Sequence, residues 1–181
     1  MIKKELLSAP AIEITLHRLA CELKENHGDF SDSVLIGIQP RGPKVLQRLL
    51  PHLKELGVAE VKHGNLDVTF FRDDFRRREA PLKANQTEIN VLLENKKVVF
   101  VDDVLYTGRS IRSALDAIQS FGRPAEIELL VLIDRRFSRH LPIQPDYTGQ
   151  QVDSLDSQKV LVEWKEEHGE DSVYIIKVED E

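Results

Sequence analysis

Apolar residues recur every three or four positions in three stretches of the chain, and this period predicts three amphipathic helices. The first runs from about residue 10 to 26, with Ser8 as a plausible N-cap. The second follows Pro43 and ends near Gly57, and the third begins around Ser110 and ends near Gly122. Their apolar positions are Ile12, Leu16, Leu19 and Leu23, then Val45, Leu46, Leu49, Leu50 and Leu53, then Ile111, Ala114, Leu115 and Ile118.

Short continuous apolar runs lie between and after these helices, and they are typical of strands covered on both faces. They comprise residues 34–38, 66–71, 98–101, 127–133, 159–164 and 173–178. Because strands alternate with helices, the pattern predicts an α/β fold whose central, mainly parallel sheet is flanked by helices. The polar stretch from about 73 to 90 has no clear period, and a loop of that length is usually a functional lid or disordered.

Composition limits the classes of protein that this chain can be. Its 181 residues, 41% apolar and 31% charged, suit one globular domain over residues 1–181. No apolar run is long enough to span a membrane, and the first residues lack the apolar core of a signal peptide, so we expect no membrane partner and a cytoplasmic location. The single cysteine excludes an internal disulfide and a cysteine zinc site.

The formal net charge of −6 lies entirely in the acidic C-terminal region, residues 163–181. Eight acids stand there against two lysines, so the other 162 residues are neutral overall. Total charge therefore does not suggest a nucleic-acid partner, although a local basic patch can still bind phosphates. The six histidines show no metal-ligand spacing along the sequence.

Polar side chains follow three of the predicted strands. They are Arg41-Gly42, the segment from Asp102 to Ser110, and Asp134-Arg135. In an open α/β sheet, ligands bind beyond the carboxyl ends of the strands. These three places are therefore the candidate site.

The segment from Asp102 to Ser110 has the most specific pattern. Its Thr-Gly-Arg-Ser turn enters a helix, where backbone N–H groups and hydroxyls can converge on one phosphate. Asp102 and Asp103 are acceptors that suit paired hydroxyls, such as a ribose diol, or hydrated Mg²⁺. A phosphate cradle beside a diol clamp matches a ribose 5-phosphate.

Two other interpretations of the acids remain open at this point. They can simply end a strand and cap a helix, or they can belong to a phospho-accepting receiver domain, which also carries acids at strand ends. The P-loop pattern has no counterpart in this sequence.

The thirteen residues 98–110 join four apolar residues, two acids and the Thr-Gly-Arg-Ser turn. This run resembles the signature of type I phosphoribosyltransferases, which use 5-phosphoribosyl 1-diphosphate (PRPP) and Mg²⁺. Within that superfamily the chain is similar to the PyrR family over nearly its whole length. The similarity is carried by residues 35–42, 67–74, 101–109, with the string Asp-Asp-Val-Leu-Tyr-Thr-Gly-Arg, and 141–147.

The resemblance implies a type I phosphoribosyltransferase fold with a small hood, about residues 135–150, over the base site. Residues 107–110 would hold the 5-phosphate, and Asp102 and Asp103 the ribose hydroxyls. Arg41 and Gly42 match the pyrophosphate loop. Arg135 lies where related enzymes contact pyrophosphate or the base edge, and Val160 lies where a late strand offers its backbone to the base.

The basic loop after Arg72 is either plainly solvated or a lid that brings an arginine such as Arg78 onto the pyrophosphate. The candidate substrate-binding residues are then Arg41, Gly42, Arg78, Asp102, Asp103, Val104, Leu105, Tyr106, Thr107, Gly108, Arg109, Ser110, Arg135 and Val160.

Transfer of the ribose from PRPP to a base should develop positive charge at C1 and negative charge on the departing pyrophosphate. Catalysis is then mainly positioning and electrostatics, with Arg41 on the leaving group and Asp102 and Asp103 near the ribose. Mg²⁺ would arrive with PRPP rather than on dedicated protein ligands. No general base is assigned, because Tyr106 stands where purine-salvage members of the superfamily carry an acid.

The PyrR family comprises bacterial pyrimidine operon attenuators with uracil phosphoribosyltransferase activity. The resemblance thus implies conversion of uracil and PRPP to UMP and pyrophosphate, UMP-responsive binding of an mRNA leader, and self-association. The hood departs from the family pattern, because Arg136 replaces a glycine and one extra residue precedes Leu141. Two alternatives follow: an RNA-binding regulator with little catalysis, and a phosphoribosyltransferase for a purine base.

Overall fold

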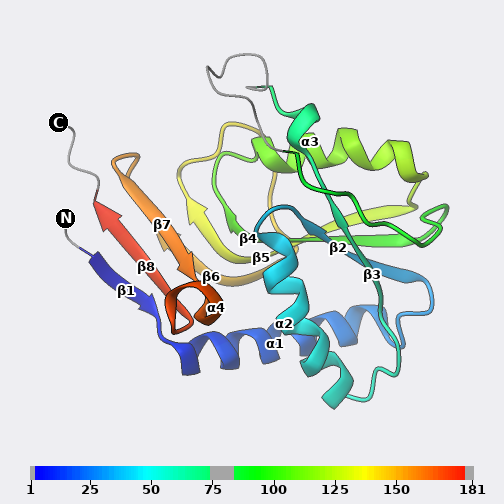
Figure 1. The fold of residues 1–181 in the computed structure, drawn as a ribbon, viewed down its shortest axis with the longest axis horizontal. Helices are drawn as coiled ribbons and strands as arrows, with labels where there is room; N and C mark the ends of the chain where they lie inside the picture. The colour runs from blue at the N-terminus through cyan, green and yellow to red at the C-terminus, as the bar shows by residue number, and fades with distance from the viewer. Residues whose placement is uncertain (1–2, 74–83, 178–181) are drawn as a thin grey trace.

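The computed structural model describes residues 3–73 and 84–177. Its centre is a parallel five-stranded sheet in the order β3-β2-β4-β5-β6, and a second, antiparallel sheet has the order β1-β8-β7 (Figure 1). The elements are β1 (Lys3–Leu7), α1 (Ala9–His27), β2 (Ser33–Ile38), α2 (Gly42–Glu55), β3 (Lys62–Leu66), β4 (Lys97–Leu105), α3 (Arg109–Ile118), β5 (Glu126–Arg136), β6 (Tyr147–Asp153), β7 (Gln158–Glu163), α4 (Lys165–His168) and β8 (Ser172–Lys177), with 3₁₀ turns at Thr69–Phe71 and Gln119–Phe121.

Helices cover both faces of the parallel sheet, α1 and α2 on one side and α3 on the other (Figure 1). Successive side chains of a strand point to opposite faces of the sheet. Leu35 of β2 therefore packs with α1 and α2, whereas Ile36 packs with α3. All six residues of β2 are buried, as the continuous apolar run predicts. Each large apolar side chain buried in these two cores contributes roughly 1.5–3 kcal/mol.

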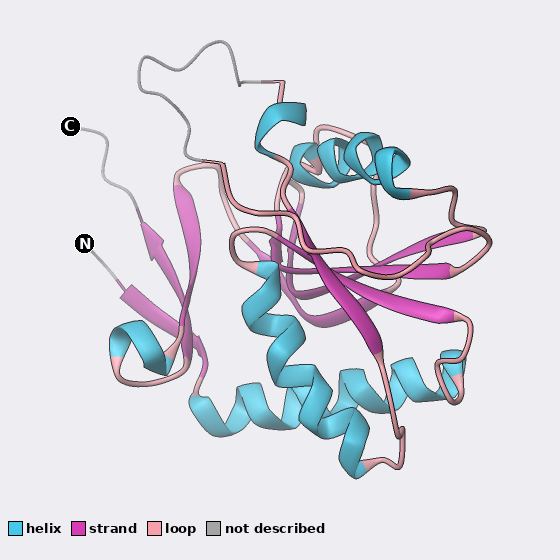
Figure 2. Ribbon diagram, turned by 45° about the vertical axis from the view of Figure 1, so that its right-hand side comes forward, coloured by secondary structure: helices cyan, strands magenta, loops and turns pink. Residues whose placement is uncertain are grey.

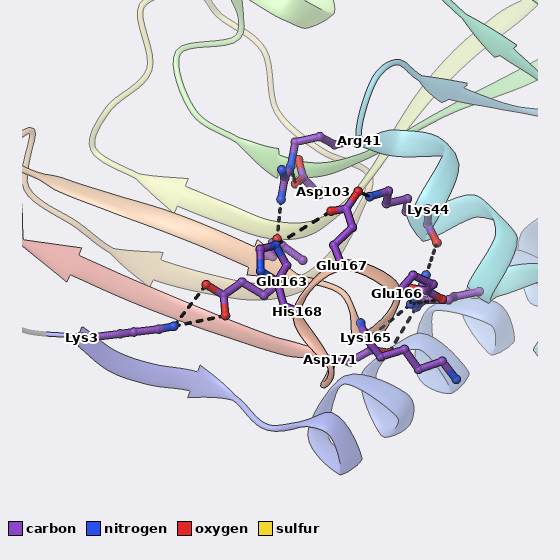
Figure 3. A network of polar contacts seen from close by, with 12 residues as sticks. Lys3, Arg41, Lys44, Asp103, Glu163, Lys165, Glu166, Glu167, His168 and Asp171 are labelled. Atoms are coloured by element: carbon purple, nitrogen blue, oxygen red, sulfur yellow. Dashed lines mark hydrogen bonds and ion pairs between the residues drawn. The ribbon is translucent and has the colours of Figure 1, made fainter.

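The small sheet joins the two ends of the chain, since β1 and β8 pair antiparallel (Figure 2). Trp164 is fully buried beneath it, and the guanidinium of Arg48 from α2 lies 4.0 Å from its ring centre. Arg48 also forms ion pairs with Glu166 and Asp171, and Lys44 pairs with Glu167 (Figure 3). Three acids of the C-terminal region, Glu166, Glu167 and Asp171, are therefore bound to basic residues of α2.

The three predicted helices are confirmed, and the parallel α/β architecture with them. Ser8 is the N-cap residue of α1, but its side chain makes no capping hydrogen bond. Among the helices of the described ranges, none is both long enough and apolar enough to cross a membrane.

The predicted strand at residues 66–71 is wrong, because the strand is Lys62–Leu66 and the chain then turns. Asp67 causes the turn: its carboxylate accepts hydrogen bonds from the backbone N–H of Thr69 (3.3 Å) and from its hydroxyl (2.7 Å). Phe70 and Phe71 are consequently exposed rather than packed in the core. The strands β1 and β6 were not predicted, since their sequences KKELL and YTGQQVD lack a continuous apolar run.

The strand order reverses between β2 and β4. From β2 the chain moves outward to β3, and it then returns to β4 on the other side of β2. Connections leave the carboxyl ends of these two neighbours in opposite directions, which opens the crevice where α/β sheets bind ligands. Both β4 and β5 run further than their apolar runs, so Asp102 and Asp134 lie on strands and not after them.

Candidate active site

A cavity of about 710 Å³ opens where the end of β4 meets the start of α3. It is lined by Arg72, Asp73, Asp102, Val104, Leu105, Tyr106, Thr107, Gly108, Arg109, Ser110, Ile111 and Ser113. Ten of these twelve residues come from one continuous stretch of chain, because a strand passes directly into a helix there. The cavity therefore coincides with the segment that the sequence singled out.

Gly108 shapes the turn at the floor of this cavity. It is the N-cap of α3 and has a φ of +90°, a left-handed conformation that favours glycine. A Cβ at this position would also lie 3.3 Å from the Cδ1 of Ile143 in the hood segment. The turn leaves the first N–H groups of α3 without partners in the helix, at the positive end of its dipole. Such N–H groups suit a phosphate.

Asp102 and Asp103 are adjacent in the chain, but their side chains lie in different environments. Asp102 lines the cavity, and its Oδ1 accepts a hydrogen bond from the N–H of Asp103 at 2.9 Å. Asp103 is 5% exposed, and its Oδ1 accepts from the N–H of Val104 at 2.7 Å. Burial first, and the charge of Asp103 second, raise the pKa of Asp102 well above its ordinary value.

Arg41 reaches the same place from the loop after β2. Its Nε donates to Oδ2 of Asp103 at 2.5 Å, and its Nη2 donates to the carbonyl oxygen of Val162 on β7 (Figure 3). A Cβ on the next residue, Gly42, would clash with the carbonyl oxygen of Val101, so only glycine lets the loop pass this close to β4. The ends of β2 and β4 therefore lie together, and Arg41 is bound to Asp103 and is not among the residues that line the cavity.

A short segment after the first 3₁₀ turn closes one side of the cavity. Asp73 forms an ion pair with Arg109, and Arg112 lies 3.9 Å from the same carboxylate. The sequence pattern pointed to Arg109 but not to Asp73, whose only signal is that it is the first acid of a long polar loop. The predicted lid residue Arg78 lies outside the described residues.

Arg139 organises the hood segment. Its guanidinium donates to Oδ1 of the buried Asp134 at 2.6 Å, to the carbonyl oxygen of Ile143 at 2.8 Å and to that of Tyr106 at 2.5 Å. The N–H of His140 donates to the carbonyl oxygen of Thr107 at 3.0 Å, which fastens the hood to the phosphate turn. No sequence motif pointed to Arg139, because its partners are backbone carbonyls and the carboxylate of Asp134, which only the folded chain brings around it.

The hood borders a second cavity, of about 500 Å³. Its lining residues are Asp134, Arg136, Phe137, Arg139, Leu141, Pro142, Ile143, Gln144, Pro145 and Gln151. Phe137 is 85% exposed on its rim.

Arg135, a candidate substrate contact, is buried and fully engaged in the fold. Its guanidinium donates to Oγ of Ser154 and to the carbonyl oxygens of Leu155 and Gln158, and it lies 3.9 Å from the ring centre of Tyr106. Burial lowers its pKa. The structure thus places Arg135 beneath the Tyr106 ring, outside both cavities.

Val160 lies at the centre of β7, an edge strand of the small sheet. The carbonyls of Gln158 and Val162 both point away from β8, since they accept hydrogen bonds from Arg135 and Arg41. Carbonyls alternate in direction along a strand, so the carbonyl of Val160 points to the same side as these two. It faces the carboxyl edge of the parallel sheet.

The arrangement can hold a terminal phosphate against helix N–H groups and place a carboxylate near the sugar that carries it. Asp102 is the open carboxylate of the pair, and an oxygen donor of this kind fits a Mg²⁺ ion that keeps most of its waters. Asp103 is less suited to a metal, because both of its oxygens already accept hydrogen bonds.

Comparison with known proteins agrees with this geometry. Residues 3–167 match the model of the phosphoribosyl transferase domain. The chain is 41% identical over 177 residues to Bifunctional protein pyrR of Enterococcus faecalis, covering 98% of each chain. It is 44% identical over 173 residues to Bifunctional protein PyrR of Gloeothece citriformis, covering 96% of this chain and 97% of the relative.

Solved structures show the same fold at low sequence identity. A hypoxanthine phosphoribosyltransferase of Trypanosoma cruzi superposes with a TM-score of 0.71 at 16% identity, over 97% of this chain and 91% of that one. One from Staphylococcus aureus gives 0.65 at 18% identity, over 84% of this chain and 79% of that one. At such identities the likeness concerns the fold alone.

Proposed function

Because the chain belongs to the PyrR family of phosphoribosyltransferase-domain proteins, we propose that it converts uracil and PRPP to UMP and pyrophosphate. The observation that carries the proposal is the cavity in which the N-terminal turn of α3 and the carboxylate of Asp102 face the same space. The N–H groups of that turn would hold the 5-phosphate of PRPP. Asp102 would then accept hydrogen bonds from the ribose hydroxyls.

Asp103 and Arg41 act as a pair in this mechanism. The ion pair orients both side chains, and the half-exposed guanidinium of Arg41 would turn from Asp103 to meet the pyrophosphate. A cation beside the departing pyrophosphate and carboxylates beside the ribose stabilise the charges that develop in the transition state. Bound Mg²⁺, which Asp102 would help to hold, supplies further positive charge on the pyrophosphate oxygens.

The base would lie between the hood and β7. Uracil offers N–H donors and carbonyl acceptors on adjacent positions of its edge. The carbonyl of Val160 faces this region and would accept from a ring N–H, whereas Arg139 holds the hood closed through Asp134 and Tyr106. The Tyr106 ring rests on Arg135 and would form one wall. Arg135 would therefore support that wall and would not contact the base directly.

The test of this proposal is a panel of bases, namely uracil, hypoxanthine, guanine and orotate, each assayed with PRPP and Mg²⁺. We expect pyrophosphate release with uracil and UMP as the product. Turnover of hypoxanthine or guanine alone would move the protein to purine salvage. Absence of turnover with every base, combined with measurable PRPP binding by calorimetry, would favour the purely regulatory alternative.

We also propose that the chain binds an mRNA leader and that UMP modulates this binding. The support is that the curated relatives, which match almost end to end, carry the name bifunctional. A filter-binding titration with a leader hairpin at two salt concentrations, with and without UMP, tests the idea. Affinity should fall as salt rises, because phosphate contacts release counterions. Binding that is absent, or that ignores both salt and UMP, would refute it.

A further inference from the structure

Helices α1 and α2 pack against one another on the face of the sheet opposite α3 (Figure 2). At their contact, His17 of α1 meets His52 and Glu55 of α2. One ring nitrogen of each histidine and one carboxylate oxygen of Glu55 all lie within 4.8 Å of one another. The two imidazole rings are 5.4 Å apart between centres, at 69° to each other.

His52 is the least accessible member of this group, and it has an unused nitrogen. Its side chain is only 9% exposed, and Nε2 lies 2.9 Å from Oε1 of Glu13. Within the described part of the chain, its buried Nδ1 has no hydrogen-bond partner. When Nε2 carries the hydrogen and donates to Glu13, Nδ1 keeps a lone pair that nothing satisfies. A buried polar atom without a partner destabilises the fold, so an electron-pair acceptor at this nitrogen would stabilise it.

We propose that His17, His52 and Glu55, the helix-junction cluster, bind a divalent transition metal of the zinc type. Two imidazoles and one carboxylate are a common set of protein ligands for Zn²⁺, with water in the fourth position. Imidazole favours such metals over Mg²⁺, which prefers oxygen ligands throughout. Glu13 would accept a hydrogen bond from Nε2 of His52 and so orient the ring, as a carboxylate commonly does for a metal-binding histidine.

The distances in the cluster suit a site that tightens on binding. Bonds of about 2.0–2.2 Å in a tetrahedral site put its ligand atoms roughly 3.4 Å apart. The observed limit of 4.8 Å exceeds this by an amount that side-chain rotation can supply, because His17 and Glu55 are both exposed. His52, which is held by Glu13, would remain in place.

The helix-junction cluster is separate from the phosphoribosyl site, since none of its members lines either of the two cavities described above. A metal there would cross-link α1 to the last two turns of α2. Binding only to the folded chain, it would stabilise the protein by mass action. It would also make the spacing of the two helices depend on the supply of metal.

Calorimetric titration of the full-length protein with ZnCl₂, after treatment with EDTA and removal of the chelator, tests the proposal. We expect saturable binding of one ion, a higher melting temperature, and no displacement by excess Mg²⁺. The exposed ligand variant His17→Ala should keep its fold by circular dichroism and bind Zn²⁺ at least about tenfold more weakly. Co²⁺ should give the visible absorption of a tetrahedral nitrogen and oxygen site in the unsubstituted protein but not in His17→Ala.

Two control variants separate this site from general metal binding. His63→Ala removes an exposed histidine of β3 outside the cluster, and Asp102→Asn changes the phosphoribosyl cavity. Both should bind Zn²⁺ as the unsubstituted protein does. Equal affinities in the His17→Ala and His63→Ala proteins would refute the proposal, as would the absence of any saturable heat. Loss of binding in Asp102→Asn alone would place the metal in the other site and refute it as well.

Discussion

Arg41 and Asp103, which are 62 positions apart in the chain, form an ion pair of 2.5 Å that joins the ends of β2 and β4. The carboxylate is buried, and the guanidinium is about half exposed. This pair sits at the point where the strand order reverses, and it connects the ends of β2 and β4 to the small sheet through the carbonyl of Val162. A substitution on either side should therefore change both catalysis and stability, in separable ways.

Replacing Arg41 with alanine should lower kcat/KM for PRPP about 100- to 1,000-fold, the range for loss of one group that stabilises transition-state charge. It should also lower the melting temperature, because the buried Asp103 loses its partner. Steady-state kinetics and thermal unfolding measure the two effects. Adding Asp103→Asn should restore part of the stability but none of the turnover. Arg123→Ala, at an exposed residue outside the site, is the matched control and should behave as the unsubstituted protein does.

Gly108→Ala should raise the KM for PRPP and destabilise the protein. Non-glycine residues in left-handed backbone cost roughly 1–2 kcal/mol, and the new Cβ would press on Ile143. Gly169→Ala is the control: its backbone is left-handed like that of Gly108, with a φ of +87°, but no atom lies within 4 Å of the added Cβ. This variant should lose a comparable free energy of unfolding, measured with urea, while its KM for PRPP stays unchanged. An equal rise in KM in both variants would contradict the phosphate cradle at Gly108.

Asp102→Asn should raise the melting temperature of the ligand-free protein at pH 7 while it weakens PRPP binding. The pKa of Asp102 is raised in the folded state above the unfolded value of about 3.9, so the folded chain binds this proton more tightly. Its contribution to stability therefore declines as pH rises above about 4, until the pH passes the raised pKa. Thermal unfolding from pH 4 to 8 should show that the melting temperature of Asp102→Asn exceeds that of the unsubstituted protein by an amount that grows with pH. A gain that is constant or shrinks with pH would contradict the assigned shift.

Arg139→Met should raise the KM for the base more than that for PRPP, and it should cost about 3 kcal/mol of stability, because the buried Asp134 is left without its cation. Asp134→Asn in the same chain should recover most of the stability. The neighbouring Arg136→Met breaks an exposed pair with Asp153 and should cost no more than about 1 kcal/mol. Urea unfolding and initial rates check each variant. If Arg136→Met were the more damaging of the two, the assignment of Arg139 as the hood's organiser would be wrong.

The sequence by itself determined the features that depend on neighbouring residues. The period of apolar positions predicted α1, α2 and α3, and the continuous run at residues 34–38 predicted a strand buried on both faces. The turn at residues 107–110 and the two acids before it could be read directly, because ten of the residues lining the main cavity lie within the single stretch 102–113. Where the local signal was polar, as in β1 and β6, or where Asp67 formed its own turn, the sequence alone misled or was silent.

Only the tertiary structure decided which distant side chains share a partner. Arg139 joins the hood to the end of β5 and to Tyr106, and Arg135 lies under the ring of Tyr106 and outside the main cavity. His17 and His52 show no ligand spacing in sequence, yet the packing of α1 on α2 brings their rings together. The physical reason is that a local pattern fixes backbone conformation over a few residues. Contacts between segments depend instead on sheet order and helix packing, which arise from the burial of the whole core.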